Sequence, residues 1–210
     1  MDPNEGERGD RAYHHGDLRR ALTEAARRLL ESDGAQALSR RAGAREAGVS
    51  PAAPYHHFKD KNELLDAVAR QGWVALSEQV AAARGEGGLT GLGMAYVRFA
   101  RENLALYQLM YARIRGQDSL PHGKGGEAYD LIKKQVRQHI GQAASGLDLE
   151  LATFAFWCLS HGLAEMRGFP RLVDLKSQIG GEDAFVRAVL EHMSVGDGHA
   201  AAPQMASADV

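Results

Sequence analysis

The sequence has a single cysteine and lacks any long apolar run. Cys158 alone can form neither an intrachain disulfide nor a cysteine-based zinc site. No apolar run approaches the roughly 18 residues that cross a bilayer. The polar start, MDPNEGERGD, lacks the basic and apolar regions of a secretory signal. We therefore expect a soluble, cytoplasmic protein without a membrane partner.

Strand-like alternation is nearly absent, and helical periodicity takes its place. Apolar residues from Leu18 to Leu30 recur on one helix face, and Gly34 marks the end of that helix. Ser39 and Ser50 are expected to cap a second and a third short helix, and a longer helix is expected from Lys61. The fold class is therefore predicted to be all-α. Further helices are expected over 90–103, 105–115, 126–144, 148–167 and 182–195.

The basic residues are concentrated near the N-terminus although the whole chain carries a formal charge of −2. Residues 11–62 hold ten Lys or Arg against six Asp or Glu, a net +4. Residues 1–10 and 63–210 each sum to −3. A basic module on an acidic body indicates an anionic partner for that module, although a solvated charged surface would give the same balance.

Helical periodicity is interrupted at GVSPAAP, residues 48–54. A helix, a tight turn and a second helix make a helix-turn-helix, whose second helix enters the DNA major groove. That groove is about 12 Å wide, so small leading residues such as those at 51–53 suit it. Pro54 keeps the second helix short. On spacing alone, an ordinary corner of a helical bundle remains the alternative.

The stretches YHHGDLRRALTEAARRLL and ALSRRAGAREAGVSPAAPYHHFKDKNELL resemble the N-terminal domain of the TetR family of transcriptional regulators along almost all of 13–66. The resemblance implies an Ω-shaped all-α dimer that binds operator DNA through its N-terminal domains and small molecules through its C-terminal ones. It also implies that the helix from Lys61 is shared by both domains. The DNA-binding residues carried over by position are Ser39, Arg41, Ser50, Pro51, Ala52, Ala53, Tyr55, His56 and Lys61. Among these, the resemblance implies phosphate contacts for Ser39, Arg41, Tyr55 and Lys61.

The chain is predicted to have four parts. A disordered tail is expected over 1–12 and another over 196–210. The helix-turn-helix domain is expected over 13–60, and the helical ligand-binding and dimerisation domain over 61–195. Gly43 departs from the family pattern, which has a branched apolar residue there. The departure predicts a soft DNA-binding domain, because glycine costs about 1 kcal/mol of helix propensity relative to alanine.

In the C-terminal part, FAFWCLSHGLAEMR at 154–167 resembles the Trp-then-His-Gly signature of the WHG type of TetR C-terminal domain. Phe154, Trp157, Cys158, His161 and Glu165 repeat at a helical spacing, which suits either a packed core or a cavity lined by aromatic and polar groups. The aromatic residues between 96 and 111 likewise suit either a packed core or a ligand cavity. The predicted ligand-binding residues are Tyr96, Phe99, Asn103, Tyr107, Met110, Tyr111, Trp157, His161 and Glu165.

The expected function is a ligand-responsive transcriptional regulator, a repressor that leaves its operator when a small, largely apolar effector binds. An all-α enzyme and a DNA-binding protein with a filled core are the alternatives. No catalytic constellation, cofactor motif or recurring metal-ligand spacing presents itself, so we expect no enzyme activity, no cofactor and no metal. The candidates for a homodimer interface are Leu147, Leu151, Phe185, Val186, Val189, Leu190 and Met193.

Overall fold

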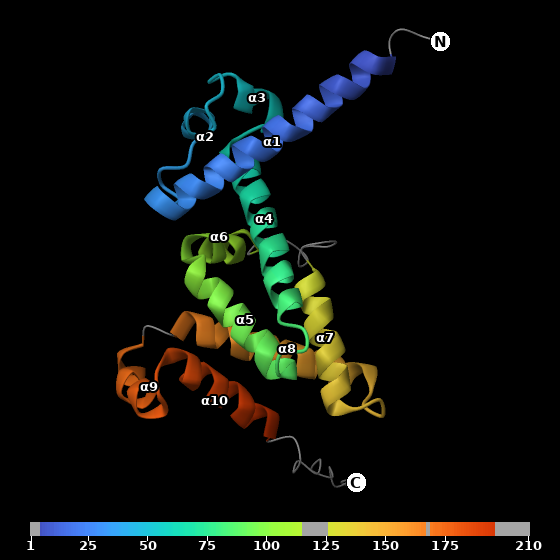
Figure 1. The fold of residues 1–210 in the computed structure, drawn as a ribbon, viewed down its shortest axis with the longest axis vertical. Coiled ribbons are helices and arrows are strands. Elements are labelled where there is room, and N and C mark those ends of the chain that lie inside the picture. Colours follow the sequence, from blue (N-terminus) through green and yellow to red (C-terminus); the bar gives the residue numbers. More distant parts are fainter. Residues whose placement is uncertain (1–4, 115–125, 167–168, 196–210) are drawn as a thin grey trace, which may run out of the picture. The chain divides into compact units, whose positions relative to one another are not determined.

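The computed structural model describes residues 5–114, 126–166 and 169–195, with the backbone alone for 5–17 and 193–195. Within these ranges every regular element is a helix, which confirms the all-α prediction (Figure 1). The chain forms two compact units. Unit 1 contains residues 1–82 and 98–131, and unit 2 contains residues 83–97 and 132–210. None of the described helices is long and apolar enough to cross a membrane.

Unit 1 begins with a three-helix arrangement. Helix α1 spans Glu5–Asp33, α2 spans Arg40–Glu46 and α3 spans Ala53–His57. Gly34 ends α1 in the left-handed region at φ +79°. Ser39 caps α2 as predicted, because its Oγ accepts a hydrogen bond from Ala42 N at 3.0 Å. Helix α1 packs against α2 and α3, and Phe58, which follows α3, is 1% exposed. These contacts build a small helix-turn-helix core.

Two N-terminal expectations differ from the structure. Helix α1 begins at Glu5, so part of the segment expected as a tail over 1–12 is helical. Helix α3 begins at Ala53, and Ser50 does not cap it. Ser50 Oγ instead accepts from Ala52 N at 3.3 Å, which organises the turn that precedes the helix. Pro54 lies in the first turn of α3, where a missing N–H group breaks no helical bond, and α3 ends after five residues because Phe58 is extended at φ −137° and ψ 119°.

The long helix α4, Lys61–Ala82, supports the rest of unit 1. Helix α6, Leu104–Ile114, packs against it. The two helices approach closely at Gly72, where a Cβ atom would lie 2.5 Å from Met110 Sδ. Helix α5 spans Gly88–Glu102 and α7 spans Glu127–Ile140. The last third of α5, from residue 98, and the start of α7, up to residue 131, also belong to this unit. Ser77 of α4 accepts a hydrogen bond from Ala128 N at 3.1 Å.

Unit 2 contains the first two thirds of α5, the rest of α7, and the C-terminal helices. Helix α8 spans Gly146–Met166, the short helix η2 spans Pro170–Leu172, α9 spans Val173–Ile179 and α10 spans Glu182–Val195. Helix α7 ends at Ile140, earlier than predicted, because Gly141 adopts φ +86°. Ser145 and Asp148 then form reciprocal hydrogen bonds at the start of α8. Helices η2 and α9 were not predicted.

Candidate nucleic-acid interface and ligand-binding residues

The nine predicted DNA-binding residues lie at the N-cap of α2, on α2, in the α2–α3 turn, on α3 and at the first residue of α4. Eight are exposed and Ala53 is half-buried. Tyr55 is 48% exposed although it is a large aromatic residue. Phe58, by contrast, is buried, as expected of a residue that fills the core. One short segment of unit 1 therefore presents hydroxyls, cations and small side chains to solvent, the groups that contact DNA phosphates and fit a groove.

Two arginines that the sequence reasoning missed hold this segment in place. Arg19 of α1 lies over the Phe58 ring, with Cζ 4.4 Å from the ring centroid, and donates a hydrogen bond to His57 O. Arg40 of α2 lies over the Tyr55 ring at 4.2 Å, and its Nη1 donates to Phe58 O at 3.0 Å. No sequence signal distinguishes these arginines from the exposed ones beside them.

The start of α4 is fixed by carboxylates. Asp60 Oδ1 accepts from Glu63 N at 2.9 Å, and Glu63 Oε2 accepts from Lys59 N at 2.7 Å. The Lys59 N–H group and the Arg19 guanidinium, 3.0 Å from Glu63 Oε1, hold the pKa of Glu63 below its usual 4.5. Lys61 Nζ donates to Ala35 O at 3.3 Å. An ammonium group has three N–H donors, so Lys61 retains donors for a phosphate.

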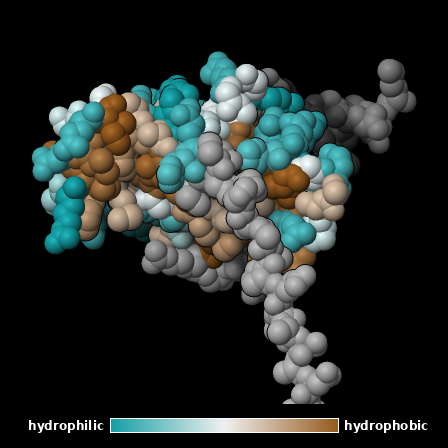
Figure 2. Space-filling view, turned by 90° about the horizontal axis from the view of Figure 1, so that it is seen from below, coloured by the Kyte–Doolittle hydropathy of each residue, from teal (hydrophilic) through white to brown (hydrophobic). Residues whose placement is uncertain are grey.

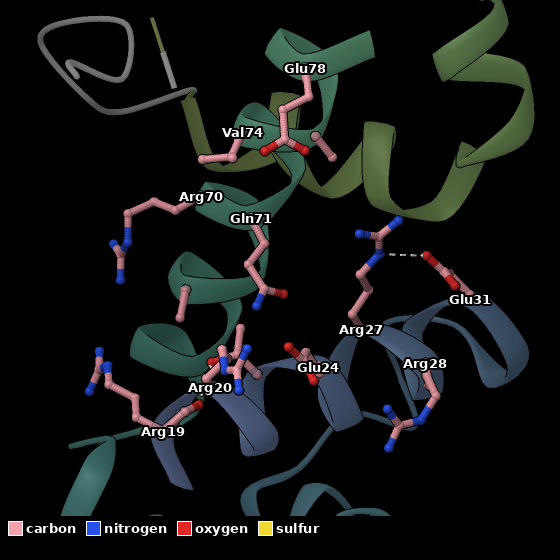
Figure 3. Close-up of a pocket in the computed structure, with 13 residues that line it drawn as sticks. Arg19, Arg20, Glu24, Arg27, Arg28, Glu31, Arg70, Gln71, Val74 and Glu78 are labelled. Atoms are coloured by element: carbon pink, nitrogen blue, oxygen red, sulfur yellow. Dashed lines mark hydrogen bonds and ion pairs between the residues drawn. The ribbon is translucent and has the colours of Figure 1, made fainter. Parts of the chain in front are cut away.

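A groove of about 1060 Å³ lies between α1 and α4 within unit 1. Figure 3 shows Gln71 projecting from α4 toward α1, and Glu24 and Arg27 projecting from α1 toward α4. Three of the five arginines that line the groove pair with carboxylates of the same chain. Ion pairs join Arg19 to Glu63, Arg27 to Glu31 and Arg28 to Glu46, all at 2.9 to 3.0 Å. Gln71 Oε1 is buried and has no hydrogen-bond partner among the described residues.

The predicted ligand-binding residues are divided between the two units. In unit 2, Tyr96 is buried and contacts Trp157 edge to face, with ring centroids 5.6 Å apart. Tyr96 Oη lies 3.5 Å from His161 Nδ1. Glu165 is exposed. The structure therefore brings three of the four unit 2 residues together.

In unit 1, the remaining predicted ligand residues take part in packing. Phe99, Tyr107 and Met110 are at most 1% exposed. Tyr111 contacts Trp73 edge to face at 5.3 Å and Tyr107 at 4.9 Å between ring centroids. Asn103 Oδ1 accepts from Arg27 Nη2 at 3.0 Å. A common site for the residues of both units stays a prediction.

Helix α8 does not present one mixed face as the sequence suggested. Its buried residues include Thr153, Trp157 and Ser160, whereas Phe154 is 61% exposed and Cys158 is exposed. Neighbouring residues lie about 100° apart around a helix, so Trp157 and Cys158 face different directions. The exposed side forms an apolar stripe, which we define as Leu147, Leu151, Phe154 and Cys158.

An apolar groove of about 360 Å³ adjoins this part of unit 2. Its lining comes from α8, Leu172 of η2, and Phe185 and Val189 of α10. Further exposed apolar side chains lie on or next to α9. This helix lies on the left in Figure 1, and Figure 2 shows brown, apolar surface on the same side. The dimer candidates Phe185, Val186 and Leu190 are buried within the chain instead. The side chain of Met193 lies outside the described residues.

Two family models match the chain. Residues 22–68 match "Bacterial regulatory proteins, tetR family", and residues 89–193 match "Tetracyclin repressor-like, C-terminal domain". The second description does not confirm the WHG type. A comparison with curated protein sequences finds no match.

Solved structures share the fold. A protein of unknown function from Rhodococcus sp. RHA1 is 33% identical, with a TM-score of 0.70 over 88% of this chain and 97% of that one. A bacterial regulatory protein of the tetR family from Rhodococcus RHA1 is 20% identical, with a TM-score of 0.57 over 87% and 98%. The multidrug binding protein EbrR, complexed with imidazole, is 20% identical, with a TM-score of 0.54 over 83% and 93%. The matched models and the helix-turn-helix show that the chain belongs to the TetR family of bacterial transcriptional regulators, which bind operator DNA and are not enzymes.

Proposed function

We propose that this regulator is a homodimeric repressor that binds an inverted-repeat operator and leaves it when a small, largely apolar effector binds. The exposure of the predicted DNA-binding residues on one helix-turn-helix carries the DNA part of the proposal. Ser39, Arg41, Tyr55 and Lys61 bind phosphates, and residues 50–53 with His56 enter the major groove. We propose a cytoplasmic location, because operator DNA lies in the bacterial cytoplasm. The domain boundary is proposed at residues 60–61, so that α4 serves both domains.

The proposed effector site uses the aromatic residues Tyr96 of α5 and Trp157 of α8, both in unit 2. Tyr96 and Trp157 supply apolar faces, and His161 supplies a polar group beside them. Such a combination of apolar walls and few polar groups is typical of small-molecule sites. EbrR supports this proposal, because that protein has the same fold and its structures contain imidazole or malachite green.

The proposed homodimer uses the exposed apolar stripe of α8. Leu147 and Leu151 are 69% and 60% exposed, so a partner surface would remove a large apolar area from water. Equivalent stripes on two chains would meet across a two-fold axis. A thiol-specific crosslinker of short reach should join two chains through Cys158, which is exposed on this stripe.

Selection of bound fragments from the source genome, with and without candidate effectors, tests the proposal. We expect inverted repeats to be enriched and an effector to weaken binding about 5- to 150-fold, the usual range of allosteric coupling. The effector must bind the released arrangement better than the DNA-bound one. Trp157→Ala should remove the response and leave the affinity of the free protein for DNA nearly unchanged.

The buried state of Phe99, Tyr107 and Met110 favours one competing function, a DNA-binding protein with a filled core. Such a protein would enrich the same fragments, but no effector would release it. If a folded Trp157→Ala variant releases DNA at the same effector concentration as the wild type, Trp157 belongs to the core and the site lies elsewhere.

A further inference from the structure

Arg40 occupies a different environment from its neighbours on α2. Ser39 and Arg41 are exposed, whereas Arg40 is half-buried against the segment that follows α3. Its guanidinium carbon lies 4.2 Å from the centroid of the Tyr55 ring. Its Nη1 donates to Phe58 O at 3.0 Å and to Lys59 O at 2.6 Å. One side chain of α2 thus contacts the tyrosine of α3 and the backbone between α3 and α4.

Helix α3 and the residues that follow it need contacts from other helices to hold their conformation. Helix α3 has five residues, and a helix this short gains too few internal hydrogen bonds to be stable alone. Within α3, Pro54 O accepts from Phe58 N at 2.8 Å, and His57 O accepts from Arg19. Arg40 supplies donors to two of the carbonyls that follow α3, Phe58 O and Lys59 O. The planar guanidinium can stack on a ring and donate in its own plane at the same time, which an ammonium group cannot do.

We propose that Arg40 is a positioning residue of the DNA interface, which fixes the Tyr55 ring so that its hydroxyl meets a phosphate. The inference rests on the proposed function, because it takes Tyr55 as a phosphate contact. The Nη1 atom of Arg40 bonds the two carbonyls and its guanidinium face covers the ring, so Arg40 can position Tyr55 without reaching DNA itself. Arg41 is exposed and has no hydrogen-bond partner among the described residues, so it remains available for a direct contact.

The salt dependence of operator binding distinguishes a residue that positions Tyr55 from a residue that contacts a phosphate directly. Each phosphate neutralised by a cation adds about 0.9 to the slope of log affinity against log salt. Arg40→Ala should weaken operator binding about tenfold, the scale of a lost charge-assisted hydrogen bond, and should lower the slope less than Arg41→Ala does. Arg41→Ala removes the same charge one residue away and should lower the slope by about 1 per subunit. Arg40→Lys should not restore the affinity, because a lysine cannot stack and donate as arginine does.

A double-mutant cycle tests whether Arg40 acts through Tyr55. Tyr55→Phe removes only the hydroxyl, and it should weaken binding about as much as Arg40→Ala. The double variant should bind about as well as either single variant, because both changes remove one contact. Additive losses, a slope that falls in Arg40→Ala as in Arg41→Ala, or full rescue by Arg40→Lys would each overturn the proposal. Arg40→Lys retains the charge and the stem, so it serves if Arg40→Ala does not fold.

Nuclear magnetic resonance spectra of the protein without DNA test the positioning role of Arg40 independently of the proposed function. The Tyr55 ring signals should shift in Arg40→Ala, and the amides of residues 55–60 should exchange faster with solvent. Unchanged ring signals and exchange would contradict the positioning role alone. Failure of the wild-type chain to bind any genomic fragment would contradict the proposed function, and with it the role of Arg40 at a DNA interface.

Discussion

Arg27 of α1 donates a hydrogen bond from Nη2 to Asn103 Oδ1 at 3.0 Å, and this bond joins the first helix of unit 1 to the junction between α5 and α6. Arg27 Nε also pairs with Glu31 Oε1 at 2.9 Å, and Asn103 Nδ2 donates to Phe99 O at 3.1 Å. The helix that supports the recognition segment is therefore bonded directly to residues predicted to line the effector site. A movement of the α5–α6 junction would therefore displace Arg27 and α1.

Asn103→Ala should lower the free energy of unfolding by about 1 kcal/mol, because it leaves a partly buried guanidinium N–H group without its acceptor. Gln108→Ala on the exposed side of α6 is the matched control and should have little effect. Urea unfolding of both variants measures the difference. Equal midpoints for Asn103→Ala and the wild type would show that the bond contributes nothing to stability.

The sequence predicted the helices of unit 1 well because periodicity, caps and glycines agree there. Ser39 caps α2 as expected, and Gly34 ends α1. Helix α9 escaped prediction because it is short, lies between Pro170 and Gly180, and exposes apolar residues such as Val173. Its sequence therefore lacks the apolar periodicity that marks a buried face.

The candidate site was predictable only in part. Family resemblance located the exposed residues of α2 and α3, but it could not distinguish Arg40, which faces the chain, from Arg41, which faces solvent. Adjacent residues of one polar run differ only by a rotation of about 100°, and tertiary packing decides which one is buried. The same limit led to the grouping of Trp157 with Cys158 on α8.

Gly43→Ala should raise the free energy of unfolding by about 1 kcal/mol, the difference in helix propensity between the two residues. The added Cβ would lie 3.9 Å from Leu64 Cδ2, an ordinary contact distance. Gly72→Ala on α4 is the contrasting variant, because its Cβ would lie 2.5 Å from Met110 Sδ. Chemical denaturation should therefore show opposite signs for the two substitutions. A destabilised Gly43→Ala variant would refute the interpretation that glycine softens α2.

Gln71→Met should stabilise the protein by about 1 kcal/mol or be neutral, because the buried Oε1 atom loses its hydrogen bonds to water on folding without gaining a partner. Methionine keeps the length of the side chain and removes the polar atoms. Thermal unfolding measures the change. A clear destabilisation would mean that a bound molecule in the α1–α4 groove satisfies Gln71 in solution.

Glu63→Gln should be less stable than the wild type at pH 7, and the difference should disappear in acid. The pKa of Glu63 is lowered in the folded protein, so its contribution is complete above the usual value of 4.5 and is lost as the pH falls through the lower folded pKa. Unfolding midpoints measured at several pH values between neutrality and acid test this. A difference that stays constant across that range would rule out an ionised Glu63 as its source.

The salt dependence of operator binding by Lys61→Ala tests most directly the claim that this helix-turn-helix surface grips DNA. The slope of log affinity against log salt should fall by about 1 per subunit, with base preference unchanged. Arg70→Ala is the matched control, since Arg70 lies about 13 Å further along α4, beyond the screening length at 0.1 M salt. Its slope should equal that of the wild type. An unchanged slope in Lys61→Ala, or a slope that falls equally in both variants, would contradict the account.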